Sequence, residues 1–192
     1  MRNTTRSGHG TDREALREEY AIVLDVVLEG QDSFRGGEII QAIGTTSFTL
    51  LELSPKTGAT VKPTDKVYIG EGRRDKIQYI KRTIDPSKLS GAAKSELLFA
   101  LQDIIDEREN DFVAFFNKAG PITIRKHSLE SIPGIGKKHL AQILEIREEK
   151  PFENFKDIKT RCTFISDPQK ALAQRIVDEL EGNDDFKIFT RR

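Results

Sequence analysis

The chain has 192 residues, of which 32% are charged and 36% hydrophobic, and its formal net charge is zero. This length suits one large domain or two small ones. The single cysteine, Cys162, excludes an internal disulfide framework, and three scattered histidines lack the spacing of a metal site. Because no apolar run is long enough to span a bilayer and no signal-peptide pattern is present, we expect a cytoplasmic protein without metal, cofactor or membrane partner.

The first 18 residues are polar and show no hydrophobic periodicity. This pattern predicts a flexible N-terminal arm over residues 1–18, in which Arg2, Arg6 and Arg13 are available for loose contacts with anions. A plain disordered terminus is the favoured interpretation of the arm.

Short apolar segments follow the arm at regular intervals, and glycine or proline separates them. Strands at this spacing, with no helical period between them, predict a small β-barrel or sandwich over residues 19–85. A five-stranded barrel closes its own edges, and the oligonucleotide/oligosaccharide-binding (OB) type is the natural candidate. The expected strands lie within residues 20–28, 38–44, 47–53, 66–70 and 75–84.

The period changes after Asp85-Pro86. Apolar residues recur at helical spacing over residues 90–110, and residues 111–120 predict a second short helix that ends at Gly120-Pro121. We therefore expect an all-α domain over residues 86–192, and an α+β fold for the whole chain.

A glycine-containing turn interrupts the helical pattern between residues 127 and 147, in the sequence Ile132-Pro133-Gly134-Ile135-Gly136. Glycine tolerates positive φ and leaves the backbone uncovered, so loop amides can face outward while Ile135 packs between the helices. The next helix begins with unpaired N–H groups and a partial positive charge, which together form an anion site. Lys137 and Lys138 are unfavourable at that end of a helix, but they become favourable when a phosphate binds there.

This segment resembles the helix-hairpin-helix motif, in which an apolar residue, Pro-Gly, an apolar residue, Gly and a polar or basic pair precede a helix. The resemblance implies sequence-independent contact with a nucleic-acid backbone. Leu140 departs from the motif, which usually has a small residue there. A simple helix–helix turn is the alternative interpretation. The candidate nucleic-acid contacts of the hairpin are Gly134, Ile135, Gly136, Lys137, Lys138 and Arg147.

Residues 155–182 repeat the rhythm of the hairpin in a degenerate form. The second turn, around Asp167-Pro168, has no glycine and carries a carboxylate that would repel phosphate. Asp167 is a suitable helix cap. We therefore assign the second copy to scaffolding.

A second basic cluster lies in the glycine-rich loop at residues 70–76, which contains Arg73, Arg74 and Lys76. Arginines in such a loop can bind phosphates or stack on bases. A solvated turn, partly neutralised by Asp75, is an equally good interpretation. Four aromatic residues are candidate stacking surfaces if they face outward: Tyr68, Tyr79, Phe34 and Phe48. Core positions are favoured for most of them, particularly Phe34 and Phe48.

An ordered series of segments resembles one archaeal family of predicted RNA-binding proteins, domain of unknown function 655. The likeness spans about residues 18–190 and implies an OB-like barrel followed by a helix-hairpin-helix domain, without implying a reaction. The segments are KVYIG (66–70), RRDKIQYI (73–80), FFNKAGPITIRKH (115–127), LESIPGIGKK (129–138), KPFENFKDI (150–158) and RIVDEL (175–180).

These observations predict a non-catalytic nucleic-acid-binding protein, with RNA favoured, DNA possible, and a ribosome- or transcription-linked duty. One alternative is a protein-interaction module. Another is a DNA glycosylase/lyase in which Lys138 is the amine nucleophile and Asp157 assists, although neither the local sequence nor a cysteine cluster supports it. The carboxylates from Asp103 to Asp111 read as a solvated helix face and not as a metal centre.

Overall fold

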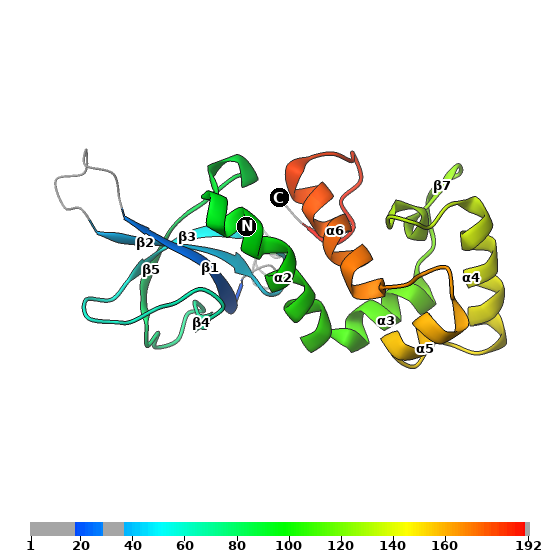
Figure 1. Ribbon diagram of the computed structural model, residues 1–192, viewed down its shortest axis with the longest axis horizontal. Helices are drawn as coiled ribbons and strands as arrows, with labels where there is room; N and C mark the ends of the chain where they lie inside the picture. Colours follow the sequence, from blue (N-terminus) through cyan, green and yellow to red (C-terminus); the bar gives the residue numbers. More distant parts are fainter. Residues whose placement is uncertain (1–17, 29–36, 191–192) are drawn as a thin grey trace, which may run out of the picture. The chain divides into compact units, whose positions relative to one another are not determined.

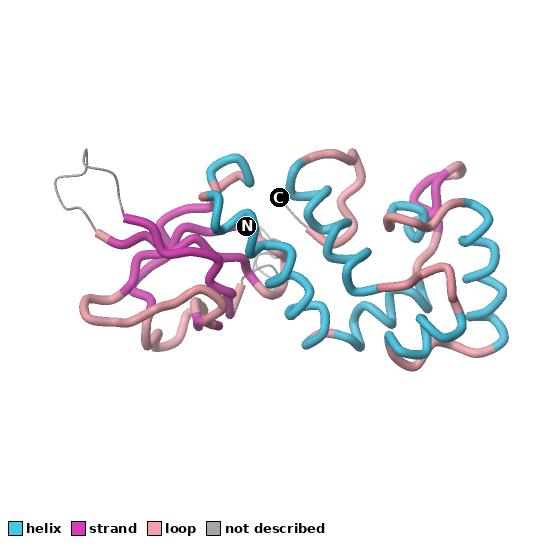
Figure 2. Tube along the Cα trace, in the orientation of Figure 1, coloured by secondary structure: helices cyan, strands magenta, loops and turns pink. Residues whose placement is uncertain are grey.

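The computed structural model describes residues 18–28 and 37–190 (Figures 1 and 2). The chain divides into a first unit that ends at Ala93 and a second unit, Lys94–Thr190. The predicted α+β class is confirmed. The arginines of the predicted arm and Phe34 lie outside the described residues. No helix in the described ranges is long and apolar enough to cross a membrane.

The first unit is built on one antiparallel sheet with the strand order β4-β1-β2-β3-β5. The five predicted strands are confirmed, but the closed barrel is not, because β4 and β5 remain the two edges of a curled half-barrel (Figure 1). With only three residues, β4 pairs along the start of β1 and does not reach β5. The strands are β1 (Tyr20–Leu28), β2 (Glu38–Gly44), β3 (Leu50–Pro55), β4 (Lys66–Tyr68) and β5 (Ile77–Thr83).

Apolar side chains of all five strands fill the concave side of this sheet, as their β-branched and leucine-rich sequences predict. Phe48 is 2% exposed, so its predicted core position is confirmed. Glu18, assigned to the arm from the sequence, is also buried. Its carboxylate accepts hydrogen bonds from the amides of Thr46 (2.7 Å), Ser47 (3.0 Å) and Thr49 (3.1 Å), which fixes the turn between β2 and β3.

The first unit extends beyond the expected boundary at residue 85 because polar side chains tie the next segment to the sheet. Gln41 donates to the carbonyl of Lys88 (3.0 Å) and accepts from the amide of Ser90 (2.8 Å). The Ser90 hydroxyl donates to Asp25 at 2.6 Å. Asp25 lies at a bulge in β1, which turns its side chain toward this segment.

The second unit is mainly helical, and the two helices predicted after residue 90 are confirmed. Two expectations are wrong. A short ribbon of two strands replaces part of the all-α domain, because Gly120-Pro121 ends the preceding helix. The helical pattern expected between residues 127 and 147 begins as a single 3-10 turn and not as an α-helix, since Pro133 disfavours helical backbone at Ile132. The elements from Pro86 onward are η1 (Pro86–Lys88), α2 (Gly91–Glu107), α3 (Glu109–Lys118), β6 (Pro121–Thr123), β7 (Lys126–His127), η2 (Ser128–Ser131), α4 (Lys137–Glu149), α5 (Phe155–Arg161) and α6 (Pro168–Glu181).

Several contacts hold the helices and the C-terminal segment of the second unit together. Arg161 donates to the carbonyls of Ile146 and Lys150 (both 2.7 Å) and so caps the end of α4. Glu179 on α6 is fully buried and binds the backbone of residues 188–190. Cys162 is also buried, and this burial raises the pKa of its thiol to about 11.

Candidate nucleic-acid interface

Residues 132–136 form a tight turn, called the Pro-Gly turn below. The amide of Ile135 donates to the carbonyl of Ile132 at 3.1 Å. Pro133 and Gly134 are the central residues, and Gly134 has a φ of +88°. Proline followed by a residue with positive φ is the pattern of a type II turn, which favours glycine at the third position. The side chains of Ile132 and Ile135 are buried, as predicted for Ile135, so the backbone between them faces outward.

The first turn of α4 leaves backbone donors unused. Gly136 is the N-cap and has no capping side chain, while its carbonyl accepts from the amide of Leu140 at 2.8 Å. The amides of Lys137, Lys138 and His139 have no hydrogen bond to any residue that the structure describes. Such amides carry the partial positive charge of the helix end.

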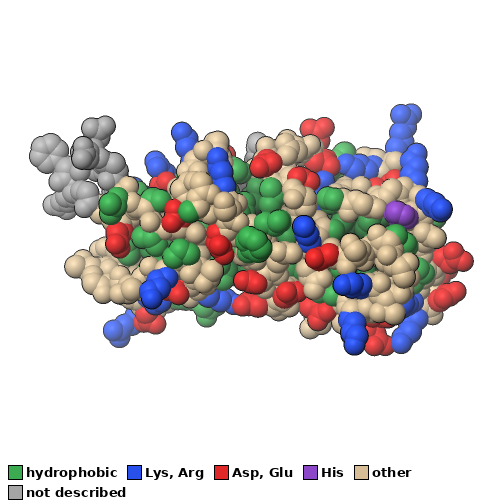
Figure 3. All heavy atoms as spheres, in the orientation of Figure 1, with side chains coloured by type: hydrophobic (Ala, Val, Ile, Leu, Met, Phe, Trp, Pro, Cys, Tyr) green, Lys and Arg blue, Asp and Glu red, His purple; other side chains and the backbone are tan. Residues whose placement is uncertain are grey.

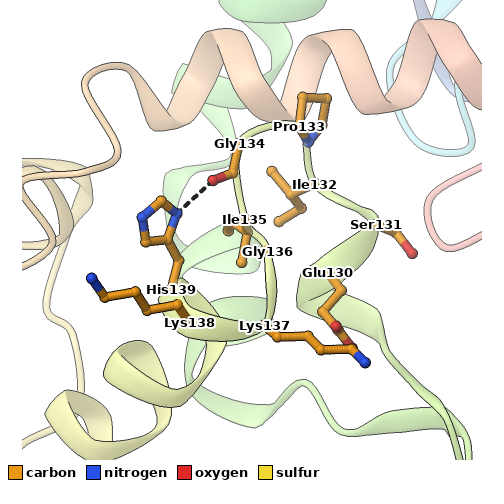
Figure 4. A pocket seen from close by; sticks show the side chains of 10 residues that line it. All are labelled: Glu130, Ser131, Ile132, Pro133, Gly134, Ile135, Gly136, Lys137, Lys138 and His139. Atoms are coloured by element: carbon orange, nitrogen blue, oxygen red, sulfur yellow. Dashed lines mark hydrogen bonds between the residues drawn. The ribbon is translucent and has the colours of Figure 1, made fainter.

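The space in front of these amides is open. The turn and the start of α4 line a hollow of about 540 Å³ (Figure 4). No atom lies within 4 Å of the place where a Cβ would stand on Gly134 or Gly136. Glu130 is the one carboxylate among the ten lining residues, and its Oε2 accepts from the amide of His127 at 2.8 Å. The backbone at these two glycines is therefore open to an approaching group.

Two lysines flank this opening. Lys137 and Lys138 are exposed, and neither forms an ion pair within the described ranges. In Figure 3, Lys and Arg side chains project around the part of the second unit that holds β7 and the start of α4, and acidic side chains lie farther along α4. Two lysines against one carboxylate thus give the turn a local excess of positive charge, although the formal net charge of the whole chain is zero.

His139 closes one side of the turn, and the sequence analysis did not identify it. Its Nδ1 lies 2.8 Å from the carbonyl oxygen of Gly134, and its ring stacks on Phe164 at 4.3 Å between centroids (Figure 4). Because the carbonyl can only accept, Nδ1 carries the proton and Nε2 is left available. Phe164 lies 25 residues farther along the chain, so no local pattern could have indicated this contact.

A family model described as "Protein of unknown function (DUF655)" matches residues 17–191. The chain belongs to this family. The resemblance found in the sequence is thereby confirmed, whereas the nucleic-acid binding that it implies stays a prediction.

Three relatives show how far the similarity extends. An uncharacterised protein of Methanocaldococcus jannaschii is 39% identical over 176 residues, which cover 91% of this chain and 80% of that protein. A crystal structure from Archaeoglobus fulgidus, assigned to the same family, has a TM-score of 0.84 and 39% identity over 91% of this chain and 100% of its own. A stretch of 60 residues is 37% identical to DNA polymerase III PolC-type of Mycoplasma genitalium, and it covers 31% of this chain and 4% of the polymerase.

Arg147 is not brought to the Pro-Gly turn. It lies about 15 Å along the axis of α4 from Lys137, at 1.5 Å per residue. Its guanidinium donates to the carbonyl of Phe116 at 2.9 Å, and burial lowers its pKa. Burial, together with the charge of Arg147, also lowers the pKa of His127, whose neutral ring accepts from the amide of Leu129 at 3.2 Å. Arg147 therefore serves the interior of the second unit.

The basic loop at residues 70–76 belongs to the first unit, and hydrogen bonds between its backbone and nearby side chains hold it in place. Arg74 donates to the carbonyl of Gly70 at 2.9 Å, and the Tyr68 hydroxyl accepts from the amide of Gly72 at 3.0 Å. Lys76 is paired with Asp65 at 2.7 Å, not with the adjacent Asp75. Arg73 is exposed and forms no ion pair within the described ranges, so it is the most available cation of the loop.

Two aspartates singled out in the sequence, Asp157 and Asp167, have structural partners. Asp157 accepts from Arg161 at 3.2 Å and from the amide of Glu153 at 3.1 Å. Asp167 caps α6 by accepting from the amide of Lys170 at 2.8 Å, as predicted. Within the described ranges, no group of three or more His, Cys, Asp or Glu residues is placed to hold a metal ion.

The two glycines of the turn are expected to differ in their tolerance of a side chain. Gly134→Ala should lower the free energy of unfolding by about 1–2 kcal/mol, because its φ of +88° strains any L residue. Gly136 has a φ of −92°, so Gly136→Ala should cost less than about 1 kcal/mol, from weaker N-capping alone. Of the two glycines, Gly134 has positive φ and Gly136 does not. Urea denaturation of both variants measures the difference, and equal losses would contradict it.

Proposed function

We propose that this protein binds nucleic acid without catalysing a reaction, and that it holds the sugar-phosphate backbone at the Pro-Gly turn. The observation that carries the proposal is a group of three amides, of Lys137, Lys138 and His139, in an open hollow beside two ammonium groups. Among the described residues, the amides have no hydrogen-bond partner and the ammonium groups no ion-pair partner. A phosphate is the common biological group that satisfies such amides and both charges together.

The position of the lysines supports this assignment. A positive charge at the first turn of a helix costs about 0.3–1 kcal/mol relative to a neutral residue. Lys137 and Lys138 carry this cost without an ion pair in the described ranges, and Glu130 is already bonded to a backbone amide. A bound phosphate changes the sign of the interaction, since it lies between the ammonium groups and the helix end.

The fold of the second unit is consistent with a helix-hairpin-helix domain, and that of the first unit with an OB-like half-barrel. The elements η2 and α4 form one hairpin around the Pro-Gly turn, and α5 and α6 form a second around a turn without glycine. Arg161 joins them by capping α4 from α5. In this arrangement the second hairpin supports the first. Arg73 of the half-barrel is a separate candidate for phosphate contact. RNA is the favoured ligand, and the similarity of one stretch to a DNA polymerase keeps DNA as the alternative.

Filter binding of the wild-type protein to RNA and DNA at 50 and 200 mM salt tests the proposal. Contact with about two to four phosphates predicts that affinity falls about 10- to 100-fold over this range, with little dependence on base sequence. Failure to retain either nucleic acid at the lower salt concentration would overturn the proposal and leave a protein-interaction module as the better assignment.

A further inference from the structure

The ribbon of β6 and β7 presents an isoleucine to solvent at its tip. Thr123 and Lys126 are paired across the ribbon, and Ile124 and Arg125 form the two-residue connection between them. Ile124 is 106% exposed, the highest value among the large hydrophobic side chains described. Single exposed apolar residues are common on protein surfaces, so the case for a function depends on how this residue is held and on what surrounds it.

Local hydrogen bonds support the tip. The Thr123 hydroxyl accepts from the amides of Arg125 (3.2 Å) and Lys126 (3.1 Å). At the base of the ribbon, the amide of Ser128 donates to the carbonyl of Gly120 at 3.0 Å. Ile124 is therefore displayed on an ordered projection, and a partner that covers it gains apolar contact without ordering a loose loop.

A buried arginine links this projection to the Pro-Gly turn. Arg175 is 3% exposed, and its Nη1 donates to Asp184 at 2.7 Å and to the carbonyl of Ser131 at 3.4 Å. Asp184 in turn accepts from Lys126 of β7 at 2.8 Å. One guanidinium thus contacts the residue just before the turn and, through Asp184, the base of the ribbon, so that it fixes the distance between the tip and the anion site.

The charges around the tip favour a polyanion as the partner. Arg125, beside Ile124, is exposed, and no ion pair neutralises it in the part of the chain that the structure describes. Asp184 is already paired with Lys126 and Arg175, which hold the pKa of its carboxyl well below the usual range. Asp185 is exposed, and its negative charge partly offsets the positive charge around the tip. With Lys137 and Lys138 beyond η2, three exposed cations (including Arg125) stand against two carboxylates, Asp185 and Glu130 of η2.

We propose that Ile124 packs against an unstacked nucleobase while the Pro-Gly turn holds the neighbouring backbone, so that the preferred ligand has unpaired bases beside its bound phosphates. This inference rests on the proposed function and extends it from backbone contact to ligand class. Apolar side chains inserted at a base step must offset the cost of unstacking, and that cost is smallest for a base that is already unpaired. RNA and DNA both offer unpaired bases beside phosphates, so the two nucleic acids are tested with separate oligonucleotides.

The test compares a duplex that contains a single-nucleotide bulge with a fully paired duplex of equal length, as RNA and as DNA. Wild-type protein is expected to bind the bulged form more tightly. Ile124→Ser should lower affinity for the bulged form about tenfold, which corresponds to partial loss of isoleucine burial, and leave affinity for the paired form within about twofold. Ile124→Leu keeps the apolar surface and should keep the preference. Thermal unfolding of all three proteins checks that the exposed substitution leaves the fold intact.

The outcomes separate this inference from the function on which it rests. Equal affinity of the wild type for the bulged and paired duplexes would overturn the role of the tip. A preference for the bulged duplex that persists in Ile124→Ser would do the same. Neither result would affect the proposal of salt-dependent binding at the Pro-Gly turn. No binding of any oligonucleotide by the wild type at low salt overturns both. Sedimentation could instead show that the wild type self-associates and that Ile124→Ser does not, with unchanged affinity for the oligonucleotides. This result would also overturn the inference and would assign the tip to a protein contact.

Discussion

Replacing Lys137 and Lys138 together by glutamate is expected to weaken binding of RNA and DNA by about 100-fold at 50 mM salt, as loss of two phosphate contacts implies. The same change should leave stability unchanged or slightly raise it, because negative charge at the start of a helix is favourable by about 0.3–1 kcal/mol per residue. A more stable protein that binds worse separates a functional role of these lysines from a structural one. Filter binding and urea denaturation of the same preparation measure the two effects.

The matched control replaces Lys156 and Lys159 on α5 by glutamate. Both residues are exposed, so the double variant has the same net charge as the test variant without altering the Pro-Gly turn. We expect its affinity to fall by less than about fivefold, as distant charges are largely screened. Equal losses in the two double variants would show that only net charge matters, and an unchanged affinity of the Lys137/Lys138 variant would refute the assigned site.

Replacing Glu179 by alanine is expected to lower the free energy of unfolding by about 3–5 kcal/mol, the range for breaking a buried ion pair from one side. Glu179 is fully buried and accepts from Arg175 at 2.9 Å. It also accepts from the amides of Ile188, Phe189 and Thr190 at 2.9–3.0 Å. Without the Glu179 carboxylate, the buried guanidinium of Arg175 loses one of its negatively charged partners, and three backbone amides lose their hydrogen-bond acceptor.

Urea denaturation measures this loss, and Glu181→Ala supplies the comparison. Glu181 lies two residues later on α6 but is exposed, so its replacement should change the free energy of unfolding by less than about 0.5 kcal/mol. A loss below about 1 kcal/mol for Glu179→Ala would contradict the view that this carboxylate anchors the C-terminal segment.

Sequence reasoning succeeded where a feature depends on neighbouring residues. Alternation and spacing locate the strands and the long helices, and the order proline, glycine, isoleucine, glycine is enough to predict the turn and the inward position of Ile135. These features arise from backbone preferences and local burial, which a short window of sequence contains.

It failed where partners are distant along the chain. Helical spacing places Arg147 on α4 but cannot show that its guanidinium bonds to a carbonyl 31 residues earlier. The pairing of Lys76 with Asp65 and the stacking of His139 on Phe164 are likewise tertiary. Whether five strands close into a barrel depends on the reach of β4 and β5, which their composition does not encode.

The buried state of Cys162 has a practical consequence. With a pKa of about 11, this thiol is almost entirely protonated at neutral pH, and its burial shields it from reagents. Maleimide dyes should therefore not label the native chain. A cysteine introduced at Gly136 or Ile124 would then be the sole reactive group, because the sequence contains no other. Fluorophores or spin labels can thus report, site by site, which surface a ligand covers.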